Sequence, residues 1–240
     1  MTTLWGRISD IGNVQTVGDV ARDQETLADI LRPYLEAGTV CIILGGGHET
    51  AYGHFLGRLR AGHEVSIVNL DVHADVRDLI NGQPHSGSSF RQALLHPDYP
   101  ARSYHVFGLS PHCVSNTHLR FMDARPGGRI WTIESSADRF DQLLDTVDGD
   151  LLVTFDLDAL DQSVAPGVSA PTVGGLNQKT WFRIARSVGA CNRIQSIDIS
   201  EMNPVYDVDG RTARVAGLTV WHFVEGLTVR TSFKKFLSES

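Results

Sequence analysis

Aspartate and histidine alternate in the pentad Asp71-Val72-His73-Ala74-Asp75, which directly follows an apolar run at residues 65–70. Side chains alternate between the two faces of an extended strand, so Asp71, His73 and Asp75 are expected to project to the same side. Carboxylate oxygens mixed with an imidazole nitrogen can bind a divalent metal ion. The pentad therefore predicts metal-dependent chemistry.

Two further apolar runs end in the same residue types. Residues 151–155 lead into Asp156 and Asp158, and residues 40–44 lead into a glycine triplet followed by His48. In open α/β sheets, ligands bind outside the carboxyl ends of the strands. Three buried strands that end at this edge would deliver their carboxylates and histidines to one place.

The candidate ligands together carry too much negative charge for a single divalent ion. Carboxylates with imidazole suit manganese and, less exclusively, zinc, iron or cobalt, and the lack of cysteine among them argues against a structural zinc site. Two ions bridged by shared carboxylates would balance the charge, an arrangement that generates a hydroxide for hydrolysis. The candidate ligands are His48, Asp71, His73, Asp75, Asp156 and Asp158.

Each of these pieces also has a purely structural interpretation. Aspartates commonly follow strands as helix caps, and a lone histidine such as His48 is most often an ordinary, partly buried side chain. Their joint occurrence at three predicted strand ends favours a metal site. Other motifs fail: Thr50 replaces the later glycine of a dinucleotide fingerprint, and the chain has no Gly-x-Ser-x-Gly elbow.

Predicted helices and strands alternate along the chain, which indicates a three-layer α/β/α fold with a mostly parallel sheet. Polar or glycine-containing loops are expected at residues 78–89 and 165–175. We see no repeat and no linker, so residues 1–240 are predicted to form one domain. The predicted helices are 23–36, 50–60, 114–122, 135–147, 178–188 and 213–225, and the predicted strands are 40–44, 65–70, 103–109, 129–133, 151–155 and 193–199.

Composition restricts the class of protein. No apolar run approaches the roughly 20 residues that span a bilayer, and the N-terminus lacks the layout of a signal peptide. The formal net charge of -7 argues against nucleic acid as the main partner. Three scattered cysteines imply no disulfide framework. A cytoplasmic protein that acts on a small molecule is expected.

Several segments, in the expected order, resemble the ureohydrolase (arginase/agmatinase) superfamily. The resemblance covers most of the chain from about Gly12 onward and implies an arginase-like three-layer fold with a binuclear manganese site. The segments that carry it are residues 45–49, 69–75, 155–161, 165–167 and 198–204.

The resemblance also implies a role for each ligand. Asp71 and Asp156 would bridge the two ions, and Glu201 would accept hydrogen bonds from the cationic amidine or guanidine group of the substrate. The place of Glu201 after the predicted strand 193–199 favours a site role over a surface carboxylate. One ion would be held by His48, Asp71, Asp75 and Asp156, and the other by His73, Asp71, Asp156 and Asp158.

Within the superfamily, the chain resembles the formimidoylglutamases most. Residues 45–49 read Gly-Gly-Gly-His-Glu, where arginases usually have Gly-Gly-Asp-His. Ser86 stands where agmatinases place a histidine, and His85 lies one residue early, so its role does not transfer. Residues 115–117 and 209–214 also resemble this subgroup.

This subgroup would hydrolyse N-formimino-L-glutamate to L-glutamate and formamide in histidine degradation. Asp75 would accept a hydrogen bond from the attacking hydroxide and pass a proton to the departing amine. The two carboxylates of the substrate need positive or hydrogen-bonding partners. Candidates for that contact are Arg77, Arg91, Arg214 and the neutral donor Asn116.

Two other functions stay open at this point. An agmatinase-type or arginase-type guanidino hydrolase would share the metal chemistry but release urea, and Ser86 counts against it. A non-catalytic metal-binding relative is the other alternative, against which the intact ligand set counts.

The chain departs from the family at its N-terminus. Family members usually begin with another strand and a glycine-rich loop ending in Gly-Pro, whereas residues 7–14 already resemble the segment that comes after that loop. We therefore expect a shortened N-terminal strand region. The wall of the substrate pocket and the contacts of a homo-oligomer are left open.

Overall fold

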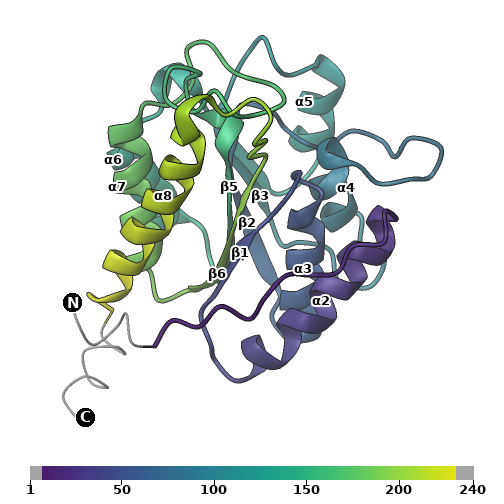
Figure 1. Cartoon of the computed structure of the whole chain (residues 1–240). Helices are drawn as coiled ribbons and strands as arrows, with labels where there is room; N and C mark the ends of the chain where they lie inside the picture. Colours follow the sequence, from purple (N-terminus) through teal and green to yellow (C-terminus); the bar gives the residue numbers. More distant parts are fainter. Residues whose placement is uncertain (1–6, 231–240) are drawn as a thin grey trace.

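The computed structural model describes residues 7–230. Its centre is a β-sheet with helices on both sides (Figure 1). The sheet has six strands in the order β1-β6-β5-β2-β3-β4, and every neighbouring pair is parallel. The predicted α/β class is confirmed, and the described sheet is parallel throughout rather than mostly parallel. The strands are β1 Cys41–Leu44, β2 Val65–Leu70, β3 Tyr104–Leu109, β4 Gly127–Trp131, β5 Asp150–Asp156 and β6 Ile194–Ser200.

Helices cover both faces of the sheet, so the predicted three layers are present (Figure 1). The helices form two groups, and each group packs against one face of the sheet through its own apolar cluster. The first group is α2 Val20–Glu36, α3 Thr50–Arg60, α4 Ser89–Leu94 and α5 Asn116–Asp123, and the second is α6 Ala137–Thr146, α7 Gln178–Ala190 and α8 Arg211–Leu227.

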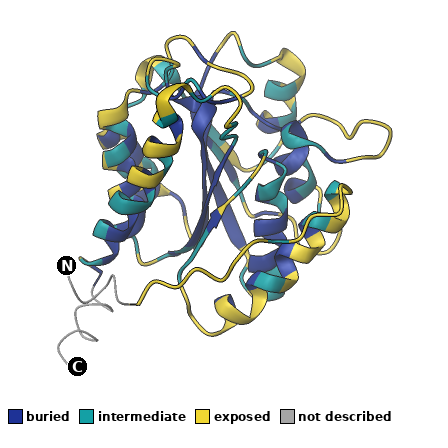
Figure 2. Ribbon diagram, in the orientation of Figure 1, coloured by how far each residue is buried: buried dark blue, intermediate teal, exposed yellow. Residues whose placement is uncertain are grey.

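The central strands are apolar on both sides because helices cover both faces. All six residues of β2 are buried, and six of the seven residues of β5 are buried as well. Figure 2 shows the buried strands at the centre and exposed residues along the outer sides of the helices. The parallel register, with Val65 opposite Asp150 and Leu70 opposite Phe155, brings the carboxyl ends of β2 and β5 side by side.

The short strand β1 lies at one edge of the sheet. No strand precedes it within residues 7–230, and residues 7–19 reach α2 without forming a helix or a strand. A cavity of about 390 Å³ lies between this N-terminal segment, α2 and β1. Within residues 7–230, no helix is both long and apolar enough to cross a membrane.

Candidate metal centre

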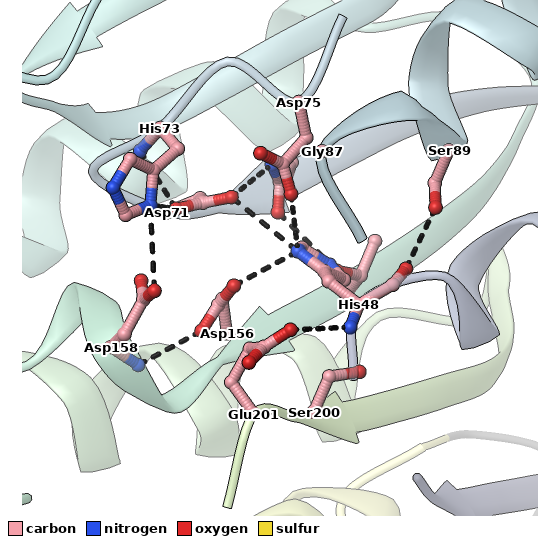
Figure 3. A network of polar contacts seen from close by, with 12 residues as sticks. His48, Asp71, His73, Asp75, Gly87, Ser89, Asp156, Asp158, Ser200 and Glu201 are labelled. Carbon is pink, nitrogen blue, oxygen red and sulfur yellow. Dashed lines mark hydrogen bonds and ion pairs between the residues drawn. The ribbon is translucent and has the colours of Figure 1, made fainter. Parts of the chain in front are cut away.

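The carboxyl ends of three strands deliver the predicted ligands to one place. Asp71 follows the last residue of β2, Asp156 is the last residue of β5, and His48 lies four residues beyond the end of β1. Figure 3 shows these side chains pointing toward one another, together with His73 and Asp158. The sequence prediction of a convergent cluster at this edge is confirmed by the geometry.

One group of ligands surrounds the ring of His48. His48 Nδ1 lies 2.9 Å from Asp156 Oδ2 and 3.1 Å from Asp75 Oδ2. It lies 3.4 Å from Asp71 Oδ2. One ligand atom from each of these four buried residues lies within 4.8 Å of the others, which is a spacing that a single ion can bridge.

A second group shares Asp71 with the first. His73 Nδ1 lies 3.3 Å from Asp71 Oδ1 and 3.4 Å from Asp158 Oδ2. Because Asp71 turns one oxygen toward each histidine, it is placed to bridge two ions, as the resemblance implies. Asp156 belongs to the first group, and its other oxygen accepts a hydrogen bond from the Asp158 amide at 2.8 Å. Bridging by Asp156 stays a prediction.

Tight turns, not an extended strand, aim these side chains. Strand β2 ends at Leu70, and Asp71 Oδ1 accepts a hydrogen bond from the His73 amide at 2.7 Å. Asp75 then adopts a positive φ of 44°. The expectation of strand alternation through the pentad is therefore wrong, because the aspartate side chain turns the backbone directly after the strand. The carboxylates still converge.

The donor set fits a divalent cation. His48 Nε2 lies 2.6 Å from Thr154 Oγ1, whose hydroxyl donates to Asn69 Oδ1 at 3.3 Å. The hydroxyl must then accept the proton of Nε2, so in the neutral ring that a metal requires, Nδ1 has a lone pair directed at carboxylates. Nδ1 is buried and has no hydrogen-bond partner within the described chain, and the same holds for Asp158 Oδ1. A cation between these atoms would satisfy both.

The electrostatics of the group also call for a cation. Burial, together with the charges of Asp158 and Asp71, raises the pKa of Asp156 well above its ordinary value. Burial likewise raises the pKa values of Asp75 and Asp158. Burial alone would lower the pKa of His48, but Asp156 and the other carboxylates raise it well above its usual range. A bound metal would take the place of the proton that these groups attract.

Asp71 differs from the other carboxylates. Burial opposes its ionisation, but hydrogen bonds to His48 and His73 lower its pKa below the ordinary value. Asn69 Nδ2 also donates to Asp71 Oδ2 at 3.0 Å. Among the four carboxylates, Asp71, which would bridge the two ions, is therefore the one most strongly held in its charged form.

Several residues that hold the ligands in place were missed by sequence reasoning. Thr154 and Asn69 support His48 and Asp71, and Ser89 Oγ donates to the His48 carbonyl at 2.8 Å. A signal was available for two of them. Asn69 and Thr154 are polar residues in apolar strands, each two positions before an aspartate and therefore on the same face of the strand.

Glu201 lies beside the centre, as the sequence predicts (Figure 3). It follows the last residue of β6 with a φ of 69°, and its amide donates to the Gly46 carbonyl at 2.8 Å. Glu201 Oε1 accepts a hydrogen bond from the His48 amide at 2.6 Å. Burial raises the pKa of Glu201.

The candidate contacts for the substrate carboxylates lie on the surrounding surface elements. Arg91 pairs with Asp78 at 2.5 Å, and its guanidinium carbon lies 4.4 Å from the centre of the Phe121 ring. Arg77, on the loop after β2, is exposed. Asn116 is the first residue of α5, Arg214 lies near the start of α8, and both are also exposed. Their role in substrate binding stays a prediction.

His85 has a structural position within the loop that follows the pentad. Its Nδ1 accepts a hydrogen bond from the Gly87 amide at 3.2 Å, and its Nε2 donates to the Asp78 carbonyl at 3.1 Å. Both ring nitrogens are thus used to fold the loop of residues 78–89. The loop ends in the short helix α4, which the sequence analysis did not predict.

Comparisons of the sequence place the chain among known proteins. The model of the arginase family matches residues 2–225. The formimidoylglutamase of Rhodococcus jostii is 35% identical over 234 residues, which covers 91% of this chain and 72% of that protein. The formimidoylglutamase of Citrobacter koseri is 34% identical over 229 residues, with 92% and 72% covered.

Solved structures agree on the fold. The formiminoglutamase of Trypanosoma cruzi, crystallised with two Mn²⁺ ions, superposes with a TM-score of 0.87 at 26% identity. The alignment covers 92% of this chain and 76% of that one. The arginase of Bacillus subtilis superposes with a TM-score of 0.79 at 20% identity, which speaks for the fold alone.

Proposed function

The chain belongs to the arginase family, and from this premise we propose that it is a manganese-dependent hydrolase of the C–N bond of a linear amidine. N-formimino-L-glutamate is the proposed substrate, with L-glutamate and formamide as products. The formimidoylglutamases that the chain matches over most of its length support this choice. The reaction would serve histidine breakdown.

The observation that carries the proposal is the lone pair of His48. A buried imidazole nitrogen directed at three carboxylates, with its other nitrogen bound to Thr154, is the arrangement of a metal ligand with its supporting hydrogen bond. Two Mn²⁺ ions per chain fit the charge of the four aspartates. We propose the ligands His48, Asp71, His73, Asp75, Asp156 and Asp158.

A metal pair held there would supply a water of lowered pKa and a charge that stabilises the transition state. The residues of the chain do the rest. Asp75, whose carboxylate lies at the centre beside His48, would accept the proton of the attacking water and deliver it to the departing nitrogen. The bond that breaks joins the formimino carbon to the α-nitrogen of glutamate.

Glu201 would bind the cationic end of the substrate. Its carboxylate is anchored to the His48 amide through Oε1, which leaves Oε2 for the N–H groups of the amidinium. The exposed Arg77, the half-buried Arg91, Asn116 and Arg214 would contact the two carboxylates of the substrate from the surrounding loops and helices. Placement of these groups on one side of the centre would orient the reacting carbon.

The decisive experiment measures glutamate and formamide release from N-formimino-L-glutamate by the Mn²⁺-loaded protein, with an EDTA-stripped sample as control. Metal-dependent release of both products in equal amounts is expected. Agmatine and L-arginine are assayed in parallel for urea. Urea without glutamate would replace the proposal with a guanidino hydrolase, and bound metal without turnover of any of the three would favour a metal-binding relative.

The partner and compartment follow from the same proposal. A small-molecule substrate needs no nucleic acid, and the formal net charge of -7 disfavours one. Cys41, Cys113 and Cys191 are free thiols, which suits a reducing cytoplasm. We further propose that the chain acts as one domain, because its described strands form a single sheet.

A further inference from the structure

Three side chains outside the metal centre have the geometry of a serine–histidine–aspartate triad. His54 on α3 lies between two residues of β6: its Nδ1 is 2.7 Å from Asp198 Oδ2, and its Nε2 is 2.6 Å from Ser196 Oγ. An ionised carboxylate can only accept, so Nδ1 carries the ring proton and Nε2 faces the serine hydroxyl. The order of the contacts is that of a nucleophile, a base and an orienting acid.

Burial excludes nucleophilic catalysis by this group. Ser196, His54 and Asp198 are each 0% exposed. A serine nucleophile must reach the carbonyl of a substrate, and no substrate can reach this one. The function of the group is therefore internal to the fold.

The group belongs to a polar row along β6. Ser196, Asp198 and Ser200 alternate with apolar residues and so share one face of the strand, which is buried throughout. Burial of polar side chains is unfavourable unless they are hydrogen-bonded. Ser200 Oγ donates to Asp198 Oδ1 at 3.1 Å, so each oxygen of this carboxylate receives a donor.

The row ends at Glu201. This residue follows Ser200 with a φ of 69°, a conformation that few residues other than glycine adopt, and such strain persists only where the surroundings enforce it. Gly46 and His48 hold Glu201 from one side through hydrogen bonds of 2.8 and 2.6 Å. On the other side, Ser200 directly precedes Glu201 and is fixed by its hydrogen bond to Asp198.

The hydrogen bond between His54 and Asp198 joins the same two segments as the hydrogen bond between the His48 amide and Glu201. His54 lies on α3, which begins at Thr50, two residues after His48. Asp198 lies on β6, which ends one residue before Glu201. The hydrogen bond between His54 and Asp198 therefore fixes the relative position of two segments. One carries Glu201, which would bind the substrate, and the other carries the candidate metal ligand His48.

We propose that His54 is a positioning residue: through Asp198 and Ser200 it aims the Glu201 carboxylate at the cationic group of the substrate. The inference rests on the proposed function, because only there does Glu201 contact an amidinium. It assigns a role in substrate orientation to a buried histidine that neither binds metal nor touches the substrate.

The first test compares two variants of His54 in the Mn²⁺-loaded protein. His54→Leu removes the bond to Asp198 and should lower kcat/KM about 10- to 100-fold, the usual effect of losing a supporting hydrogen bond, with two Mn²⁺ still bound per chain. His54→Asn places an amide N–H near the position of Nδ1 and should recover most of the activity. Recovery would not be expected if only the volume of the ring mattered.

Thr219→Val serves as the matched control. Thr219 Oγ1 accepts a hydrogen bond from Trp181 Nε1 at 2.8 Å, is also buried, and lies between α7 and α8 on the opposite face of the sheet. Its loss should lower the free energy of unfolding without changing kcat/KM. An unchanged kcat/KM in His54→Leu, with a loss of stability like that of Thr219→Val, would overturn the proposal.

A double-mutant cycle with Glu201→Gln tests the route of the effect. If His54 acts through Glu201, the loss caused by His54→Leu should largely disappear once Glu201 is replaced. Fully additive losses would refute the route. Should His54→Leu fail to fold, Ser200→Ala carries the same cycle, since it removes only the hydroxyl that donates to Asp198 from the residue before Glu201.

Binding of guanidinium chloride, measured by calorimetry, separates this inference from the proposed function because it needs no turnover. Weaker guanidinium binding by Ser200→Ala than by the parent would support the positioning role even if N-formimino-L-glutamate is not hydrolysed. Normal turnover by the parent, with unchanged guanidinium binding and kcat/KM in both Ser200→Ala and His54→Leu, would defeat the inference alone.

Discussion

At the scale of single residues, His48 is the point where the supports of the centre meet. Its amide binds Glu201, its carbonyl accepts from Ser89, and its Nε2 is bound to Thr154. The one polar atom left over is Nδ1, which faces the carboxylates. A ligand fixed at every other polar atom needs little reordering when a metal binds, which favours affinity.

Asp156→Asn tests the charge of the centre at constant shape. The amide oxygen can still accept the hydrogen bond of the Asp158 amide, but one negative charge near His48 is lost. Mn²⁺ content should fall below two per chain, and kcat should fall by at least about 100-fold. Metal analysis and steady-state kinetics measure the two effects.

The matched control is Asp145→Asn, which removes the same charge from an exposed position in α6. It should change neither metal content nor kcat. An Asp156→Asn protein with full metal and full activity would exclude Asp156 as a ligand.

Arg91→Ala tests the proposed contact with the substrate carboxylates. Arg91 is already paired with Asp78, so substrate must compete for it. Loss of a charged hydrogen bond should raise KM about tenfold with little change in kcat. Asp78→Asn frees the same guanidinium and should shift KM in the opposite direction. Equal KM values in Arg91→Ala and the parent would exclude Arg91 as a substrate contact.

At the scale of elements, long periodic segments were predictable. Strand β2 and helix α3 have the bounds that the sequence predicts. An unbroken apolar run defines the strand, and glycines before and after residues 50–60 mark the ends of the helix. The six residues of α4 are too few to show a helical period. The predicted strand at residues 129–133 lies two residues earlier in the structure, at Gly127–Trp131, where glycines hide the strand signal.

The cluster of candidate ligands was predictable, but the residues that support them were predictable only in part. Asp71 and Asp156 stand out because carboxylates directly follow apolar runs. The contact of Glu201 with His48 joins residues 153 positions apart, and no local pattern contains it. The positive φ of Asp75 and of Glu201 depends on such long-range contacts as well.

Two glycines of α8 give a matched pair for the packing of that helix. A Cβ on Gly226 would lie 2.1 Å from the Arg186 carbonyl oxygen of α7, whereas a Cβ on Gly217 would meet nothing within 4 Å. Gly226→Ala should therefore destabilise the fold by about 1–3 kcal/mol. Gly217→Ala should stabilise it by about 0.5–1 kcal/mol, because alanine favours a helix interior.

Urea unfolding of both glycine variants measures the difference. The midpoint should move down for Gly226→Ala and up for Gly217→Ala, with the slope unchanged. Equal shifts in the two variants would show that α7 and α8 are not in close backbone contact at this point.

At the scale of the whole molecule, the metal centre is expected to control stability and its pH dependence. Folding raises the pKa values of Asp156, Asp75 and Asp158 above their ordinary value of 3.8. A carboxyl group of this kind stabilises the folded state while protonated, and that contribution is lost as the pH rises past 3.8. Metal-stripped protein should therefore lose stability as the pH rises toward neutrality.

Thermal unfolding of stripped and Mn²⁺-loaded protein checks this. Metal binds the folded state and replaces the missing protons, so loading should raise Tm more at about pH 8 than at about pH 5. A Tm gain that is the same at both values would show that these carboxylates are not the groups that the metal neutralises.

The strand order has a consequence for how the protein is made. β1 and β2 are synthesised early, but β5 and β6 must insert between them before the sheet is complete, since the order is β1-β6-β5-β2. A nascent chain therefore carries His48, Asp71 and Asp75 on segments that have no neighbour to hold them together. Asp156 and Asp158 of the candidate ligand set, and Glu201, which holds the His48 amide, leave the ribosome later still. We therefore expect metal capture to be a late event in biosynthesis.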